Sequence, residues 1–314
     1  MMRADTVLIV APEEDIHAQG VQAVLQRSGI RVVRVDTADF PTTLGLILEW
    51  SSTHVSKLIL ADGTEMTRDE ITAVWWRRPR SFRIDAAVID ARDREFGRLN
   101  AVHAFEALVT TLPARVVNDL WMERRALRKG LQLEIASQCG LRIPYTIISN
   151  DAAVIRAVAA ARPRMIYKPL EKINGAADGT KMLELEDIPR LTQLRHGPAI
   201  FQEFIEPGYD LRIYIIGDTI YSAKLTSDHP SGRVDIRMDF SAHIEPYVLP
   251  EPLQMALFRM MKTLGLVSGA IDMKVDVDGN YFFLEVNPSG QWIYIEMETG
   301  QPITETLAAY LAGH

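Results

Sequence analysis

Residues Gly269-Ala-Ile-Asp-Met-Lys-Val-Asp-Val-Asp-Gly-Asn-Tyr-Phe-Phe-Leu-Glu-Val-Asn-Pro-Ser-Gly290 form the most informative stretch of the sequence. Polar and apolar side chains alternate around Asp278-Gly279-Asn280, a sequence typical of a hairpin turn, so two antiparallel strands are predicted. Alternate residues of a strand point to one face, which places Glu285 beside Asn287 and lets the partner strand bring Asp272 alongside. Three oxygen donors on one face are what a hard cation such as Mg2+ requires.

The same spacing has a second interpretation. Acidic side chains in otherwise apolar strands are costly unless they are paired or bind a cation. Lys274 lies two residues after Asp272, and a salt-bridged pair of strands would satisfy the acidic groups without a metal. On spacing alone, both interpretations stay open.

The N-terminal part of the chain predicts a parallel sheet. Thr6–Val10 and Arg31–Val35 are strand-sized apolar runs, and the segment between them has helical spacing, which is a β-α-β order. Further strands are expected at 57–60, 73–76 and 115–117, and a long helix at 92–111. Residues 1–118 are therefore expected to form an α/β domain. The loop after the first strand has no G-x-G-x-x-G, so NAD and FAD are not proposed.

Two further units are expected. Residues 119–196 combine a basic helix at Trp121–Gln138, strands at 144–148 and 164–168, and a polar loop at 171–180, which predicts a small α+β unit. Residues 197–314 are rich in strands, with helices at 251–264 and 303–311. The strands expected there are Ala199–Phe204, Leu211–Ile216, Thr219–Lys224, Val234–Met238, Gly269–Val275 and Tyr281–Val286.

Composition narrows the classes of function. The chain of 314 residues is 47% apolar and 24% charged, which is ordinary for a globular enzyme, and its net charge of -7 argues against nucleic acid and anionic membranes as partners. No apolar run approaches the ~20 residues that a membrane span needs, so a cytoplasmic protein is expected. Cys139 is the only cysteine and is expected to be a packed side chain. Neither G-x-S-x-G nor H-E-x-x-H occurs, so a serine hydrolase and a zinc protease are not expected.

Leu284-Glu-Val-Asn-Pro288, preceded by Asp272, resembles the metal-binding signature of the ATP-grasp superfamily, and further motifs follow in the expected order. The resemblance implies two α+β units that sandwich ATP, preceded by an N-terminal α/β pre-ATP-grasp domain. It implies ATP and two Mg2+ as cofactors, with Asp272, Glu285 and Asn287 as metal ligands. For the nucleotide it implies Lys129 and Lys168 on phosphates, Asn174, Gly175, Gly179 and Thr180 in a phosphate loop, Gln202, Glu203, Phe204 and Ile205 at adenine, and Glu206 at the ribose. Near the γ-phosphate and substrate it implies Asp210, Arg212, Lys224 and Arg237.

A narrower resemblance comes from Val74-Trp-Trp-Arg-Arg-Pro79, Glu285-Val-Asn-Pro-Ser-Gly-Gln-Trp292 and Glu298-Thr-Gly-Gln-Pro-Ile303, which are similar to the maturases of microviridin-like peptides, the graspetides. It implies a precursor peptide with a leader segment as partner, and ester or amide crosslinks between Asp or Glu and Ser, Thr or Lys side chains. A homodimer is expected by family analogy alone. Arg77 and Arg78 are expected to meet a substrate carboxylate, with Arg233 as a further substrate contact.

Other interpretations of the same residues remain. The same nucleotide site would serve a ligase that adds an amino acid to a protein terminus or a small molecule, or a regulator that binds ATP without catalysis. Alternation would place one of Trp75 and Trp76 in the core and the other outside, with the neighbouring arginines solvated. The charged segment Thr226–Asp239 is expected to be an exposed strand edge or hairpin, along which a peptide could add.

Overall fold

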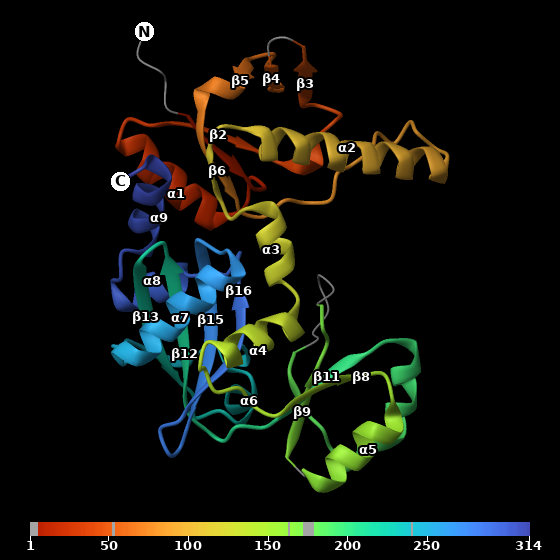
Figure 1. The fold of residues 1–314 in the computed structure, drawn as a ribbon, viewed down its shortest axis with the longest axis vertical. Helices are drawn as coiled ribbons and strands as arrows, with labels where there is room; N and C mark the ends of the chain where they lie inside the picture. Colours follow the sequence, from red (N-terminus) through yellow and green to blue (C-terminus); the bar gives the residue numbers. More distant parts are fainter. Residues whose placement is uncertain (1–5, 52–53, 163, 172–178, 240) are drawn as a thin grey trace.

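A computed structural model describes residues 6–51, 54–162, 164–171, 179–239 and 241–314. Figure 1 shows three units: an N-terminal domain, a small sheet with its helices, and a larger C-terminal sheet. The chain is mixed α/β, as the sequence predicted. Among the described residues, no helix combines the length and apolar character needed to cross a bilayer.

The N-terminal domain is built on a parallel sheet with strand order β2-β1-β6-β7. Asp15 begins α1, because its side chain accepts a hydrogen bond from the Ala18 amide. A small antiparallel sheet, β3-β4-β5, stands beside the main sheet. The elements are β1 (Thr6–Val10), α1 (Ile16–Arg27), β2 (Arg31–Val35), β3 (Gly45–Trp50), β4 (His54–Ile59), β5 (Glu65–Thr67), β6 (Ile71–Trp76), α2 (Ala91–Thr111) and β7 (Arg115–Val117).

The small unit is an antiparallel sheet of order β10-β9-β11-β8 with its own apolar core, which includes Ile155, Met165 and Phe201. Its elements are β8 (Thr146–Ser149), α5 (Ala152–Ala161), β9 (Met165–Lys168), β10 (Lys181–Met182), a 3-10 helical stretch (Leu185–His196) and β11 (Ala199–Glu203). Strand β11 pairs with β8 and β9. Strand pairing therefore places residues 199–203 with the small sheet, beyond the boundary expected at residue 196.

The C-terminal sheet has the order β14-β13-β12-β15-β16. Its elements are α3 (Leu120–Ala126), α4 (Lys129–Gln138), β12 (Pro207–Ile216), β13 (Thr219–Thr226), α6 (Pro230–Val234), β14 (His243–Pro246), α7 (Glu251–Leu264), β15 (Ser268–Asp276), β16 (Tyr281–Asn287), α8 (Ile293–Thr299) and α9 (Ile303–Ala312). Helices α3 and α4 precede the small sheet but pack against α7, and α4 also packs against β16.

The two faces of this sheet have different neighbours. One face, which carries Leu211, Ile213 and Ile215, packs on α4 and α7. The opposite face carries Asp210 and Arg212, and we call it the cavity face. Further along the cavity face, Tyr214 and Ile216 share a core with β1, α1, β6 and α9; this shared core includes Val7, Trp75, Trp292 and Leu307. The N-terminal domain therefore covers one end of the cavity face and leaves the other end open.

Two expectations about secondary structure were wrong. The helix expected at Trp121–Gln138 is two helices with a break at 127–128, beside which buried Gln132 donates to the Ala126 carbonyl at 2.6 Å. Val234–Met238 is not a strand: α6 ends at Val234 and a 3-10 turn follows at Ile236–Met238. The alternative that left one of Trp75 and Trp76 outside the core is also wrong, because both are buried by apolar layers on the two faces of the parallel sheet.

Candidate nucleotide and metal site

A cavity of about 1030 Å³ separates the cavity face from the small sheet. Residues from both sheets, from the segment 234–244 and from α8 line it. Those that the sequence analysis had named are Arg78, Lys168, Thr180, Gln202, Glu203, Phe204, Ile205, Asp210, Arg212, Arg237, Asp272, Glu285 and Asn287. The connection from β11 to β12 lies at the wall between the two sheets.

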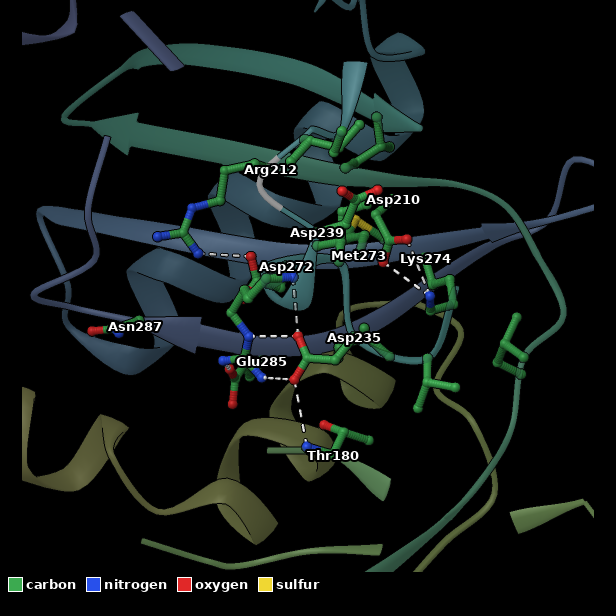
Figure 2. Close-up of a pocket in the computed structure, with 18 of the residues that line it drawn as sticks. Thr180, Asp210, Arg212, Asp235, Asp239, Asp272, Met273, Lys274, Glu285 and Asn287 are labelled. Carbon is green, nitrogen blue, oxygen red and sulfur yellow. Dashed lines mark hydrogen bonds and ion pairs between the residues drawn. The ribbon is translucent and has the colours of Figure 1, made fainter. Parts of the chain in front are cut away.

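Strand register brings the charged groups of the cavity face together. Arg212 pairs across the strands with Asp272, and Asp272 with Glu285, so all three side chains share one face. The Arg212 Nη1 donates to Asp272 Oδ1 at 2.7 Å, and its Nη2 donates to the Gln291 carbonyl at 2.9 Å. Figure 2 shows this contact at the centre of the group. Burial disfavours the charge on Arg212, but Asp272 outweighs it and raises the arginine's pKa.

Glu285 is held by cations from two other elements. The Lys129 ammonium, at the start of α4, forms an ion pair with Glu285, and Arg237 Nη1 lies 3.7 Å from its other oxygen. Burial opposes ionisation of Glu285, but Lys129 and Lys168 outweigh it and lower the carboxyl pKa. Glu285 is therefore an anion among three cations, Lys129, Lys168 and Arg237. A phosphate group that binds together with a cation would change the net charge of this group only a little.

Lys274 does not pair with the predicted metal ligands. Its ammonium contacts Asp210 at 3.1 Å and also donates to the Arg233 carbonyl. Burial raises the pKa of Asp210 to about 6, although Lys274 acts in the opposite direction. The salt-bridged alternative is thus present in a different form: Asp272 and Glu285 are paired, but with Arg212 and Lys129.

The small sheet contributes Lys168, whose side chain enters the cavity between the two sheets. Burial lowers the pKa of this ammonium, which donates a long hydrogen bond of 3.4 Å to the Gln202 side chain. The backbone amides of Glu203 and Phe204 are used within the sheet, donating to the carbonyls of Tyr145 and Arg164. Glu206 lies outside the cavity lining and forms ion pairs with Arg164 and Arg233, which lower its pKa.

Asp235 is a site residue that the sequence analysis missed. It accepts from the Thr180 amide at 3.4 Å and binds Arg237 through both carboxylate oxygens, at 2.7 and 2.6 Å. Burial opposes its charge, yet Arg237 holds the pKa of Asp235 at about 2. Of the predicted phosphate loop, Gly179 and Thr180 lie beside this group, while Asn174 and Gly175 fall outside the described residues. Tyr294, on α8, also lines the cavity and had no signal in the sequence.

Two of the predicted residues lie in the wrong place. Lys224 pairs in register with Leu211, on the face opposite Arg212, where it contacts Glu245 at 2.8 Å and the Tyr209 ring. It cannot assist Arg212 from there. Arg77 is only 1% exposed and donates to the carbonyls of Ser289 and Gly290, so it cannot meet a substrate.

The other two predicted substrate contacts differ from each other. The half-exposed Arg78 lines the cavity, with Asp15 at 3.7 Å from its Nε. Arg233 borders a separate hollow of about 230 Å³ and is paired with Glu206. Arg78 is therefore the predicted substrate arginine that faces the cavity.

The donor set fits Mg2+ bound together with a phosphate. Asp272, Glu285 and Asn287 offer carboxylate and amide oxygens from adjacent strands, and hard cations prefer such donors. Within the described ranges, no three His, Cys, Asp or Glu side chains form a cluster able to hold a metal by themselves. Mg2+ commonly completes its coordination with water and substrate phosphate oxygens, which the adjoining cavity has room to supply.

Comparison with known proteins agrees with this geometry. Residues 6–121 match the model of the MvdD pre-ATP-grasp domain. The fold is similar to that of macrocyclase MdnC from Microcystis aeruginosa MRC, crystallised with its precursor peptide MdnA, at 28% identity and a TM-score of 0.86 over 98% of this chain and 100% of that one. A comparison with curated proteins gave no match.

Two further solved structures share the fold. One is a RiPP-associated ATP-grasp ligase of Chryseobacterium gregarium with ADP and leader and core peptides, at 20% identity and a TM-score of 0.89 over 98% of this chain and 97% of that one. The other is ATP-grasp ligase PsnB with a minimal precursor variant, Mg and ADP, at 24% identity and a TM-score of 0.83 over 99% of this chain and 98% of that one. The ATP-grasp fold and the pre-ATP-grasp domain inferred from sequence motifs are confirmed.

Proposed function

We propose that this chain, which joins an MvdD-type pre-ATP-grasp domain to an ATP-grasp fold, is an ATP-dependent ligase that crosslinks a ribosomal precursor peptide. A side-chain carboxylate of the peptide would be activated as an acyl phosphate, and a Ser, Thr or Lys side chain would displace the phosphate to form an ester or an amide. The observation that carries the proposal is the charged group Arg212, Asp272 and Glu285, which faces Lys168 across one cavity.

The adenine would lie against the connection from β11 to β12. Gln202, Glu203, Phe204 and Ile205 line the cavity there, and their backbone runs along its wall. The phosphates would then point toward Lys168 and Thr180 on one side and the cavity face on the other. Because Glu206 lies outside the lining, its contact with a ribose would require its ion pairs with Arg164 and Arg233 to rearrange.

We propose that Asp272, Glu285 and Asn287 would hold two Mg2+ ions, which would neutralise phosphate charge during transfer. Arg212 contacts Asp272 and Arg237 lies near Glu285, so their guanidinium groups can stabilise the negative charge that develops on the transferred phosphoryl group. The carboxylate oxygen forms the new bond to phosphorus as the bond to the ADP oxygen breaks.

The second half of the reaction needs a positioned nucleophile and little water. The hydroxyl or amine attacks the acyl carbon, loses its proton and expels phosphate. Arg78 faces the cavity from the N-terminal domain, and its planar group suits a peptide carboxylate. Acyl phosphates hydrolyse, so the site must exclude water while the peptide is bound. We also propose that the reaction takes place in the cytoplasm, where ATP and a newly made peptide meet. A homodimer is a further proposal, made by family analogy.

The decisive experiment incubates the purified protein with ATP, Mg2+ and the short peptide encoded beside its gene. ATP-dependent loss of the mass of one water per crosslink, measured by mass spectrometry, supports the proposal. A mass gain that matches an added amino acid would instead favour the amino-acid ligase. An unchanged peptide without ADP formation would contradict both.

The matched pair Glu285→Gln and Glu245→Gln controls the experiment. Both remove a carboxylate that is paired with a lysine, but Glu245 lies on the edge strand β14 and pairs with Lys224 away from the cavity face. Glu285→Gln should abolish ADP formation while the protein remains folded, and Glu245→Gln should retain it. Equal activity in the two variants would remove the proposed cation site.

A further inference from the structure

Arg77 is a buried cation of the N-terminal domain that contacts the loop after β16, the strand that carries Glu285 and Asn287. It follows β6 directly, and its amide donates to the Val10 carbonyl at 3.1 Å, so its backbone is fixed to the parallel sheet. Its Nη1 donates to the carbonyls of Ser289 at 2.6 Å and Gly290 at 3.0 Å. These residues belong to the loop 288–291, which follows β16 and its last residue, Asn287.

The guanidinium has one carboxylate and two aromatic rings as neighbours, while its buried Nε and Nη2 make no hydrogen bond to the described residues. Asp15 Oδ2 lies 3.5 Å from its Nε, and its carbon lies 5.2 Å and 5.7 Å from the ring centres of Trp292 and Trp75. His17 fixes the two residues that follow this loop by accepting from the amides of Trp292 and Ile293. Burial and then Arg77 lower the pKa of His17 to about 3, so the imidazole stays neutral and can accept.

The loop transmits these contacts to the site. The Ser289 amide donates to Asn287 Oδ1 at 3.0 Å, and the Gln291 carbonyl accepts from Arg212, whose other nitrogen holds Asp272. The loop also passes close to the cavity face, because a Cβ at Gly290 would lie 3.0 Å from Arg212 Nη2. One short segment thus joins Arg77 to two of the three candidate ligands.

We propose that Arg77 is a positioning residue for the cation site: by fixing the loop 288–291 it sets Asn287 directly and Asp272 through Arg212. This inference rests on the proposed function, since it presumes that Mg2+ binds there. The pre-ATP-grasp domain is then a working part of the metal site, although none of the metal ligands belongs to it. Residues that orient metal ligands typically change metal affinity by roughly 10–100-fold when they are removed.

Arg115 offers a matched control. It also links the N-terminal domain to the C-terminal part of the chain, because its Nη1 donates to the carbonyls of Tyr310 at 3.0 Å and Leu311 at 3.4 Å. Its guanidinium lies 5.5 Å from the Tyr310 ring centre. It therefore shares the chemistry of Arg77, two carbonyls and an aromatic ring, but ends on α9 instead of the loop 288–291.

The experiment measures ADP binding to the full-length protein by calorimetry, without Mg2+ and at increasing Mg2+. For Arg77→Met we expect the apparent dissociation constant of Mg2+ to rise roughly 10-fold or more. The affinity for ADP without Mg2+ should stay within about twofold of the wild type. Arg115→Met should match the wild type in both. An unchanged Mg2+ constant in Arg77→Met, or an equal rise in Arg115→Met, would overturn the inference.

Arg77→Lys keeps the test decisive if Arg77→Met does not fold. Lysine retains the charge beside Asp15 but lacks the rigid planar guanidinium that holds Nη1 between the carbonyls of Ser289 and Gly290. We expect it to raise the Mg2+ constant by a smaller factor, and a constant equal to that of the wild type would refute the positioning role. If the ADP affinity of the wild type does not depend on Mg2+, the proposed function is refuted instead. Failure of the proposed function and failure of the positioning role are therefore distinguishable.

Discussion

Replacing Glu123 by glutamine should change how the stability of the protein depends on pH. Glu123 lies on α3, is buried, and is 3.3 Å from the Ser289 hydroxyl. Burial raises its pKa from 4.5 to about 7, although Ser289 and Arg77 act in the opposite direction. Between these two values the folded protein holds a proton that the unfolded chain has released.

The sign and size of the effect follow from linkage. Because the folded-state pKa is the higher one, the contribution of Glu123 is fully present below pH 4.5 and is lost as the pH rises through about 7. A difference of about 2.5 between the folded and unfolded pKa values corresponds to a contribution of about 3 kcal/mol to the free energy of unfolding. The glutamine variant does not titrate there. Its unfolding free energy relative to the wild type should therefore rise by about 3 kcal/mol between pH 4.5 and pH 8.

Urea unfolding followed by tryptophan fluorescence is a suitable assay. The five tryptophans, at positions 50, 75, 76, 121 and 292, all lie outside the small unit, so the signal reports on the body that contains Glu123. Glu134→Gln, on the exposed side of α4, controls for the loss of one formal charge. A difference between Glu123→Gln and the wild type that stays constant from pH 5 to pH 8 would refute the reasoning.

Three further predictions concern the site. Lys168→Met should lower kcat/KM for ATP by roughly 100-fold or more, because a buried cation at the phosphates is lost; steady-state kinetics that match the wild type would exclude Lys168 from the phosphate site. Lys224→Ala should leave kcat within about twofold and change the unfolding free energy by less than about 1 kcal/mol, since its pair with Glu245 lies on the other face; a large loss of turnover would return Lys224 to the site. Gly290→Ala should cost about 1–3 kcal/mol or more, because its Cβ would lie 2.2 Å from the Ala270 Cβ; a thermal unfolding midpoint equal to that of the wild type would contradict the close approach.

The parts that the sequence predicted well are those encoded locally. The hairpin of β15 and β16 follows from alternation and a turn sequence within about twenty residues, and its register then places Asp272 opposite Glu285. The parallel sheet of the N-terminal domain follows in the same way from apolar runs separated by a helical segment. In both cases the information lies within one stretch of chain.

The errors concern information that the sequence spreads over distant segments. The face on which Lys224 lies depends on its register with β12, which a single strand does not reveal. Arg77 donates to carbonyls more than two hundred positions later in the chain. The sequence around Arg77 and Arg78 therefore does not reveal which of the two arginines is buried. The alternating charges at 226–239 resemble the pattern of a strand. Pro230 in the first turn of α6 and Asp235 at the start of the following 3-10 turn instead favour helical turns.

The position of α9 has a consequence for synthesis on the ribosome. This helix packs against α1, and its Ile303, Leu307 and Leu311 complete the shared core with Val7 and Val21. Figure 1 shows the two helices together although they come from opposite ends of the sequence. Domains usually fold as the chain emerges, N-terminal part first, at about 5–20 residues per second. Here the first domain to emerge keeps an uncovered apolar surface until residues 303–311 have been made, and exposed apolar surface of this kind favours aggregation.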